Sequence, residues 1–233
     1  MALPKLVTAK YPVTIPSTKK NTFFRPFLMR EQKVLMMAME SNDQEQILNA
    51  ICDIVKVCVD GVENPGSMPM FDLEYLFLRI RAKSVGELID VTLKCPNCGR
   101  NQPKQINLDE VNVHFNEEVS SKIMLTDKMG VIMRYPCLRD SVQDIANLNA
   151  EGIVKFICNS IDLVFDEATT YTRKDFTHEE IQNFVESMST SQFENISKFY
   201  QNLPQLKKTV ECKCSGCEKD FSLDFRGLTD FFT

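Results

Sequence analysis

Two short cysteine motifs are the part of this sequence whose residue types and spacing are best suited to chemistry. One spans Cys95–Cys98 (C-P-N-C) and the other spans Cys214–Cys217 (C-S-G-C). A tight turn at each motif can point two thiolates to the same side, where nearby backbone N–H groups support the sulfurs. Two such turns that face each other supply four sulfurs in a tetrahedron, roughly 2.3 Å from a zinc ion. The motifs therefore predict one zinc site with four ligands: Cys95, Cys98, Cys214 and Cys217.

The sequence around the two motifs indicates a ribbon made of two similar halves. Residues 91–95 and 210–214 are both extended apolar–polar approaches to the turn, and a strand-like piece follows each turn. Each half also has a glycine that suits a sharp backbone path: Gly99 and Gly216. The alternatives are a redox C-x-x-C or two unrelated pairs of buried thiols. A redox motif usually opens a helix, whereas these turns lead from strand to strand.

The predicted zinc site is structural rather than catalytic. Four thiolates leave no open coordination position for water or substrate. Because 115 residues lie between Cys98 and Cys214, the metal would tie the end of the chain to its middle. Closing so long a loop costs the unfolded chain entropy, which the metal bonds must offset.

Five further cysteines lie outside the two motifs. Cys212 aligns with Leu93 at a strand position, so we interpret it as a small core residue; the alternative is that it replaces or supplements a zinc ligand. Three others fall on the apolar faces of helical patterns and are expected in the core: Cys52, Cys58 and Cys158. Cys137 has no evident partner in the sequence.

The composition is that of an ordinary globular protein. Of the 233 residues, 43% are hydrophobic and 25% are charged, which excludes a wholly disordered chain and allows one large core or two small ones. The formal net charge of −5 disfavours avid binding of a phosphate backbone by the whole protein. We find no signal peptide and no apolar run long enough to span a bilayer. We therefore expect a cytoplasmic protein with reduced thiols.

The patterns of apolar residues predict a mixed set of elements. Strands over 11–15 and 21–25 form a small N-terminal hairpin, and a second hairpin joins 122–126 to 131–135. Helices are expected at seven places: 28–40, 43–59, 72–83, 141–148, 152–164, 179–188 and 192–202. The last two begin at sequences that fit the capping-box pattern, Thr177–Glu180 and Ser191–Glu194.

These elements predict an α+β fold, with helical segments around a discontinuous four-cysteine zinc ribbon. The chain is expected to divide into four parts: 1–83, the N-terminal hairpin and helices; 84–115, the first half of the ribbon; 116–207, an inserted hairpin and helical segment; and 208–233, the second half of the ribbon.

Signs of catalysis are missing. The sequence contains no phosphate-binding, dinucleotide-binding, metalloprotease or nucleophile-elbow motif. Its two histidines, His114 and His178, lie in a strand-like stretch and a helix start, without a nucleophile–base pattern around them. We therefore expect no enzymatic activity.

Two groups of apolar residues could either pack in the core of the protein or form a contact surface for a partner. Four methionines crowd the helix predicted over 28–40: Met29, Met36, Met37 and Met39. Leu35 and Ala38 favour core packing of that helix, and the alternative is an adaptable contact surface. At the other end, Phe231 and Phe232 are expected to pack on the ribbon or the helices, with docking into a partner as the alternative.

Taken together, these residues resemble the baseplate hub assembly proteins of T4-type tailed phages. The resemblance is carried by residues 11–41, by Cys95–Cys98, by Arg134-Tyr135-Pro136 and by the ending from Cys214 to Phe232. It covers nearly the whole chain. The opening block together with the Phe-Phe ending is fairly specific, whereas the C-x-x-C pairs alone are not.

The resemblance implies a non-enzymatic protein that helps to build the hub at the centre of the baseplate, in the cytoplasm of the infected bacterium. The implied partners are other baseplate hub or tail proteins, with the tape-measure protein as one candidate, and neither a membrane nor a small-molecule substrate. The resemblance leaves open whether the protein stays in the virion baseplate or acts only as an assembly chaperone.

A zinc-ribbon nucleic-acid-binding protein is the alternative function. Seven basic residues surround the cysteine motifs: Lys94, Arg100, Lys104, Lys207, Lys208, Lys213 and Lys219. Acidic residues interleave with them, and no stripe of aromatic residues accompanies them for base stacking.

Overall fold

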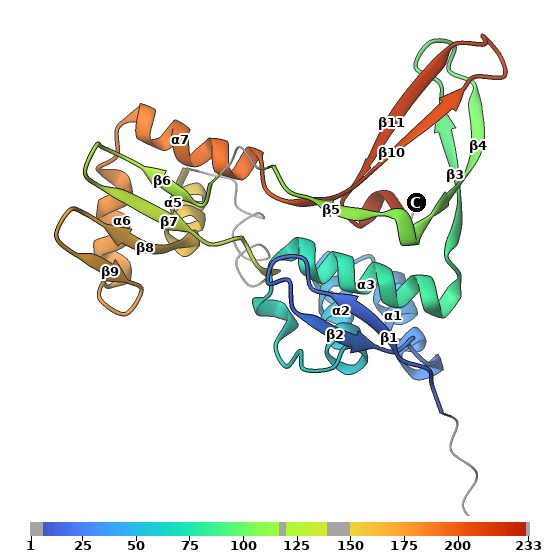
Figure 1. Cartoon of the computed structure of the whole chain (residues 1–233), viewed down its shortest axis with the longest axis horizontal. Coiled ribbons are helices and arrows are strands. Elements are labelled where there is room, and N and C mark those ends of the chain that lie inside the picture. Colours follow the sequence, from blue (N-terminus) through green and yellow to red (C-terminus); the bar gives the residue numbers. More distant parts are fainter. Residues whose placement is uncertain (1–6, 117–119, 139–149, 232–233) are drawn as a thin grey trace, which may run out of the picture. The chain divides into compact units, whose positions relative to one another are not determined.

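The computed structural model of the chain describes residues 7–116, 120–138 and 150–231. Within these residues the chain divides into two compact units. The first unit combines the residues up to His114 with those from Gln205 onward, and the second is built from residues 115–204. Helices and several small sheets occur together (Figure 1), which confirms the α+β class.

The first unit opens with a hairpin and three helices (Figure 1). Strand β1 (Tyr11–Thr14) pairs with β2 (Asn21–Phe24), and helices α1 (Met29–Glu40), α2 (Gln44–Cys58) and α3 (Met70–Val85) follow. Asp43 caps the N-terminus of helix α2, and its carboxylate accepts hydrogen bonds from the N–H groups of Glu45 and Gln46. Helix α3 carries the deepest core positions, among them Leu76, Leu78 and Ile80.

Helix α1 differs from the core helix that the sequence favoured. It packs mainly against α2 and buries only Glu31 and Ala38, while Leu35 is half-buried. Its four methionines are all exposed. The core interpretation of the methionines is therefore wrong, because a single neighbouring helix covers only one narrow side of α1.

The ribbon consists of two antiparallel hairpins in separate sheets (Figure 1). Strand β3 (Leu88–Lys94) pairs with β4 (Asn101–Asn107), and β10 (Gln205–Lys213) pairs with β11 (Asp220–Arg226). Strand β10 also pairs with β5 (Asn112–His114), which gives the order β11-β10-β5. Buried and exposed residues alternate along β3, as expected for a strand with one face on a core.

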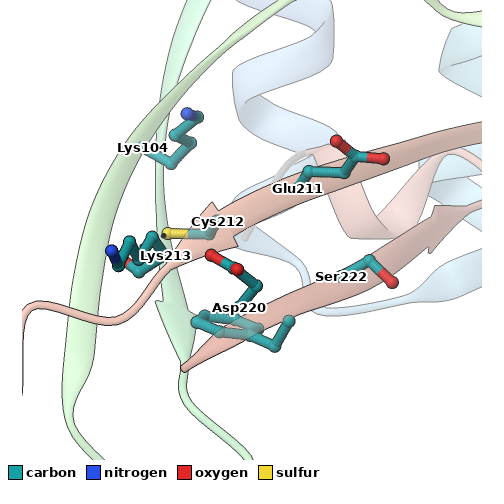
Figure 2. A pocket seen from close by; sticks show the side chains of 7 residues that line it. Lys104, Glu211, Cys212, Lys213, Asp220 and Ser222 are labelled. Atoms are coloured by element: carbon teal, nitrogen blue, oxygen red, sulfur yellow. Dashed lines mark hydrogen bonds between the residues drawn. The ribbon is translucent and has the colours of Figure 1, made fainter. Parts of the chain in front are cut away.

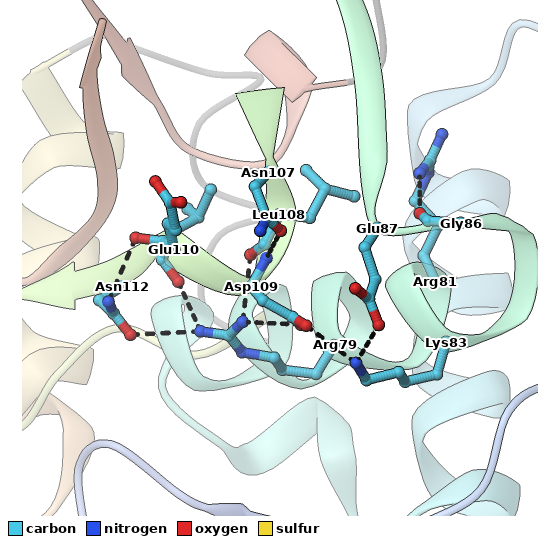
Figure 3. Close-up of polar contacts among 11 residues, drawn as sticks. Arg79, Arg81, Lys83, Gly86, Glu87, Asn107, Leu108, Asp109, Glu110 and Asn112 are labelled. Atoms are coloured by element: carbon cyan, nitrogen blue, oxygen red, sulfur yellow. Dashed lines mark hydrogen bonds and ion pairs between the residues drawn. The ribbon is translucent and has the colours of Figure 1, made fainter. Parts of the chain in front are cut away.

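A polar network joins α3 to the short 3-10 turn Leu108–Glu110 at the base of the ribbon (Figure 3). The Arg79 guanidinium donates hydrogen bonds to the carbonyl oxygens of Leu108 (3.1 Å) and Val111 (2.7 Å). The Lys83 ammonium lies 2.8 Å from the Asp109 carboxylate and also contacts Glu87. The base of the ribbon is thus fixed to the helical part of the same unit.

The C-terminal turn η4 (Thr229–Phe231) closes the first unit. The Phe231 side chain is buried, and its ring centroid lies 5.8 Å from that of Phe225 on β11. The expectation that this end packs on the ribbon is correct for Phe231. Phe232 lies outside the described residues.

The second unit contains a four-stranded antiparallel sheet and three helices. The strands β6 (Lys122–Met124), β7 (Gly130–Met133), β8 (Ile161–Phe165) and β9 (Thr170–Thr172) follow one another in the sheet. The helices are α5 (Ala150–Ser160), α6 (His178–Glu186) and α7 (Thr190–Gln201). One hydrophobic cluster, with Val131, Ile161 and Ile196 fully buried, lies between helices and sheet.

Four sequence expectations for this unit need correction or stay open. The helix expected over 152–164 ends at Ser160, because residues 161–165 continue as β8, where pairing with β7 and β9 satisfies their backbone groups. The insertion therefore holds a four-stranded sheet rather than a single hairpin. The capping box of α7 uses Ser189 and Gln192, not Ser191 and Glu194. The helix expected over 141–148 lies outside the described residues.

None of the helices within the described ranges combines the length and the apolar character needed to cross a membrane.

Candidate metal centre

The tips of the two hairpins bring four cysteine sulfurs together. Cys95 and Cys98 come from the β3–β4 turn, and Cys214 and Cys217 come from the β10–β11 turn. Their Sγ atoms all lie within 4.8 Å of one another, and none of them is in a disulfide. In the residues that the structure covers, this is the one group of three or more His, Cys, Asp or Glu side chains close enough to share a metal ion.

The spacing of the sulfurs suits a tetrahedral metal. The Sγ atoms of Cys95 and Cys217 are 3.8 Å apart, and those of Cys98 and Cys214 are 3.5 Å apart. Four sulfurs at about 2.3 Å from a central ion are separated from one another by about 3.8 Å. Both measured separations are close to this value, so the four sulfurs are a suitable donor set for a single metal ion.

The backbone of the two turns follows the same path. In the first turn the N–H of Cys95 bonds to the carbonyl of Arg100, and the N–H of Gly99 bonds to the carbonyl of Cys95. In the second turn the N–H of Cys214 bonds to the carbonyl of Lys219, and the N–H of Glu218 bonds to the carbonyl of Cys214. Two segments far apart in the sequence thus build equivalent halves of one site.

The glycines of the two turns have different roles, which the sequence did not indicate. The residue after the second cysteine has positive φ in both turns, and it is Gly99 (+73°) in one and Glu218 (+57°) in the other. Gly216 instead provides space, because a Cβ atom there would lie 2.9 Å from the Nε atom of Arg100. Of the two glycines, only Gly99 lies at a position where positive φ favours glycine.

Hydrogen bonds from the protein stabilise negative charge on two of the sulfurs. The N–H groups of Cys217 and Gly216 lower the pKa of the Cys214 thiol to about 6. Burial raises the pKa of Cys95, but the N–H groups of Cys98 and Asn97 outweigh burial and lower it overall. Since the thiolate is the form that binds metal, these turns prepare Cys95 and Cys214 as ligands.

Crowding of the sulfurs acts in the opposite direction at Cys98. The N–H of Arg100 favours its thiolate, but the neighbouring sulfurs, with Cys214 first among them, raise the pKa of Cys98 to about 11. A cation held between the four sulfurs would remove this conflict, because it would compensate their negative charge. Cys95 and Cys214 are buried while Cys98 is exposed, so one side of the site is open to solvent.

A glutamine from the first hairpin also supports the second turn. Gln102 on β4 is buried, and its Nε2 donates to Sγ of Cys214 over 3.6 Å. Its Oε1 accepts from the N–H of Ser215 at 3.3 Å. Gln102 was not among the site residues expected from the sequence. Its one detectable signal is a polar side chain at a strand position opposite the apolar Leu93.

Cys212 is not part of the four-sulfur cluster. It lies on β10 opposite Phe221 and lines a shallow pocket together with Lys104 and Asp220 (Figure 2). The core interpretation of Cys212 is wrong, because its side chain is only half-buried near the open tip of the ribbon.

The other cysteines are mostly structural. Cys58 and Cys158 are buried as expected, Cys52 is only half-buried, and burial raises the pKa of all three thiols to about 11. Cys137 is buried, with an Arg134 guanidinium nitrogen 3.7 Å from its sulfur. Both histidines are exposed, on β5 and at the start of α6.

Several basic residues of the ribbon are neutralised by acids. Lys207 pairs with Asp224 at 3.0 Å, and Lys208 pairs with Glu110 at 2.5 Å. Two of the seven basic residues around the cysteine motifs are therefore compensated by carboxylates, which reduces the positive charge that the ribbon offers to a nucleic-acid backbone.

Comparison with known proteins identifies the family. The family model described as T4 bacteriophage base plate protein matches residues 8–233, so both units and all four clustered cysteines fall within the match. No curated protein and no solved structure matches the chain. Because the match covers essentially the whole sequence, this chain belongs to the T4 bacteriophage base plate protein family.

Proposed function

We propose that this protein is a non-enzymatic interaction protein that helps to assemble the hub at the centre of the phage baseplate. The family match over residues 8–233 is the observation that carries the proposal. The partners are other hub or tail proteins, with the tape-measure protein as one candidate. The protein acts in the cytoplasm of the infected bacterium, either as an assembly chaperone or as a subunit that stays in the baseplate.

The proposal includes a structural zinc ion held by Cys95, Cys98, Cys214 and Cys217. Tetrahedral sites of four thiolates are typical of zinc or of iron–sulfur clusters, and a single metal suits sulfurs that lie 3.5–3.8 Å apart. The ion would supply a cross-link between the two hairpins. The protein side of the site supplies the preformed turns, the N–H groups that favour thiolates, and the amide of Gln102.

The arrangement of the first unit suits a scaffold. The ribbon is fixed at its base by the contacts of Arg79 and Lys83, and the metal would fix it at its tip. The second unit is inserted between His114 and Gln205, which are paired neighbours on β5 and β10. A rigid ribbon would thus hold both ends of the insertion together, as a protein that presents surfaces to several partners requires.

Co-expression with the other tail genes, followed by pull-down and mass spectrometry, tests the proposal. We expect recovery of hub or tail proteins with the wild type and weaker recovery with Cys98→Ser, while Cys212→Ser serves as the matched control. Recovery of no tail protein by a folded wild type would contradict the assembly role. Tight, salt-sensitive DNA or RNA binding in a gel shift would favour the nucleic-acid alternative instead.

A further inference from the structure

Helix α1 presents an exposed methionine face to solvent. The side chains of Met29, Met36 and Met37 are 75%, 53% and 60% exposed, in a helix of 12 residues. Met29 and Met36 lie on the side opposite to the buried Glu31 and Ala38, and Met37 lies on the adjoining side of the helix. Single exposed apolar residues are normal, whereas three exposed methionines in one short helix mark a candidate interaction surface.

The orientation of this face is fixed by the buried side of the helix. The Glu31 carboxylate lies 3.1 Å from the Arg25 guanidinium and accepts a hydrogen bond of 2.6 Å from the N–H of Leu28. These contacts hold the first turn of α1 against the chain that enters it. The helix therefore has a fixed orientation, in which the methionine side chains are accessible to a partner without any rotation of the helix.

Two opposite charges flank the methionines symmetrically. Lys33 and Glu40 are both exposed, and each is three and a half residues from the midpoint between Met36 and Met37. Seven residues make nearly two helical turns, so the two charges lie on one stripe about 10.5 Å apart. Neither side chain forms an ion pair with any residue that the structure describes.

This pattern is complementary to itself in the antiparallel sense. If a second copy of α1 lies across the first, with a two-fold axis at the midpoint of Met36 and Met37, Lys33 of each copy faces Glu40 of the other. The four central methionines meet at the axis, where their flexible side chains can interdigitate. A parallel arrangement would place like charges opposite each other.

We propose that the exposed face of α1 binds a second copy of this chain in an antiparallel, two-fold symmetric pair. The interface is isologous, as is usual for dimers of identical chains. The pairing depends neither on the metal nor on the identity of any other partner. It is a small interface, because a helix of 12 residues is about 18 Å long, and we expect a dissociation constant on the order of 10–100 µM.

Sedimentation equilibrium over a concentration series tests the pairing in the full-length, metal-loaded protein. Lys33→Glu and Glu40→Lys each place two like-charge pairs across the axis, so each variant alone should weaken the dimer about tenfold or more. An equimolar mixture of the two variants should associate, because every Glu of one chain then faces a Lys of the other. The double variant Lys33→Glu/Glu40→Lys should dimerise as the wild type does.

The controls separate this surface from others. Lys174→Glu makes the same charge change at an exposed position in the second unit and should leave the dimer unchanged. Circular dichroism of each variant should match the wild type, since neither charge is buried. The proposal is overturned if the wild type is monomeric at every concentration. It is also overturned if the wild type forms a dimer that neither Lys33→Glu nor Glu40→Lys weakens. The same holds if these two variants still dimerise as the wild type does but no longer bind another tail protein.

Discussion

The side-chain amide of Gln102 bonds to the sulfur of Cys214 across the two halves of the ribbon, with 3.6 Å between Nε2 and Sγ. The two residues are 112 positions apart in the sequence. A residue of the first hairpin thus orients a cysteine ligand of the second hairpin. This contact links the two hairpins in addition to the cluster of four sulfurs. Groups that hold metal ligands in place commonly change metal affinity by 10–100-fold when they are replaced.

Replacing Gln102 with Met should weaken metal binding about tenfold, because the side chain keeps its size but loses the amide that contacts Cys214 and Ser215. Competition with a chromophoric chelator measures the affinity. Gln105→Met, at an exposed position of the same strand, is the matched control and should have no effect. Equal affinities for the two variants would show that the Gln102 contact is not used.

Glu218→Gly should stabilise the ribbon by about 0.5–1 kcal/mol, because glycine adopts positive φ without the steric cost that glutamate pays there. The urea concentration at which half of the zinc is released measures the effect.

Gly99→Ala is the converse test at the equivalent position of the other turn. An added Cβ atom at Gly99 would make only an ordinary contact, 4.0 Å from Cε of Lys94, so this change should cost about 1 kcal/mol through the backbone conformation. The same sign for both changes would contradict the equivalence of the turns.

The Glu74 carboxyl should make the first unit less stable as the pH rises. Burial raises its pKa from 4.5 to about 7, and the N–H of Leu228 offsets only part of this. Between these two values the folded chain holds a proton that the unfolded chain has lost. Stability is therefore greatest below pH 4.5 as far as this group is concerned, and it falls as the pH rises to about 7.

Glu74→Gln tests this prediction, because it stays neutral and keeps an acceptor for Leu228. At pH 8 the variant should be more stable than the wild type by about 1–2 kcal/mol, and the difference should vanish near pH 4. Urea unfolding followed by circular dichroism measures it. Glu63→Gln, at an exposed position, should show no such pH dependence. A Glu74→Gln variant that is less stable at pH 8 would refute the prediction.

The candidate metal centre was largely predictable from the sequence, because the spacing within each C-x-x-C motif and the similar flanks define the turn chemistry locally. The bonds that Cys95 and Cys214 make within their turns are local in the same sense. Gln102 was not predictable, since its role depends on the position of a hairpin more than one hundred residues away. The positive φ of Glu218 was hidden because no glycine marks it.

The errors in the fold also have physical causes. The apolar spacing of residues 152–164 predicted one continuous helix. That spacing does not show that the helix ends and a paired strand begins at Ile161. The methionines of α1 read as core because a sequence pattern shows which side of a helix is apolar but not whether another element covers it. Both errors depend on tertiary contacts that short sequence windows do not contain.

The metal content of the purified chain, measured by native mass spectrometry beside atomic emission, tests the zinc site most directly. We predict one zinc ion per chain in the wild type and in Cys212→Ser, because Cys212 lies outside the cluster, and none in Cys98→Ser. Loss of zinc should open the tip of the ribbon, while helical circular dichroism persists because the helices bury their own apolar faces. A wild-type protein that is metal-free yet fully folded, or a Cys212→Ser variant that loses its metal, would contradict the proposed site.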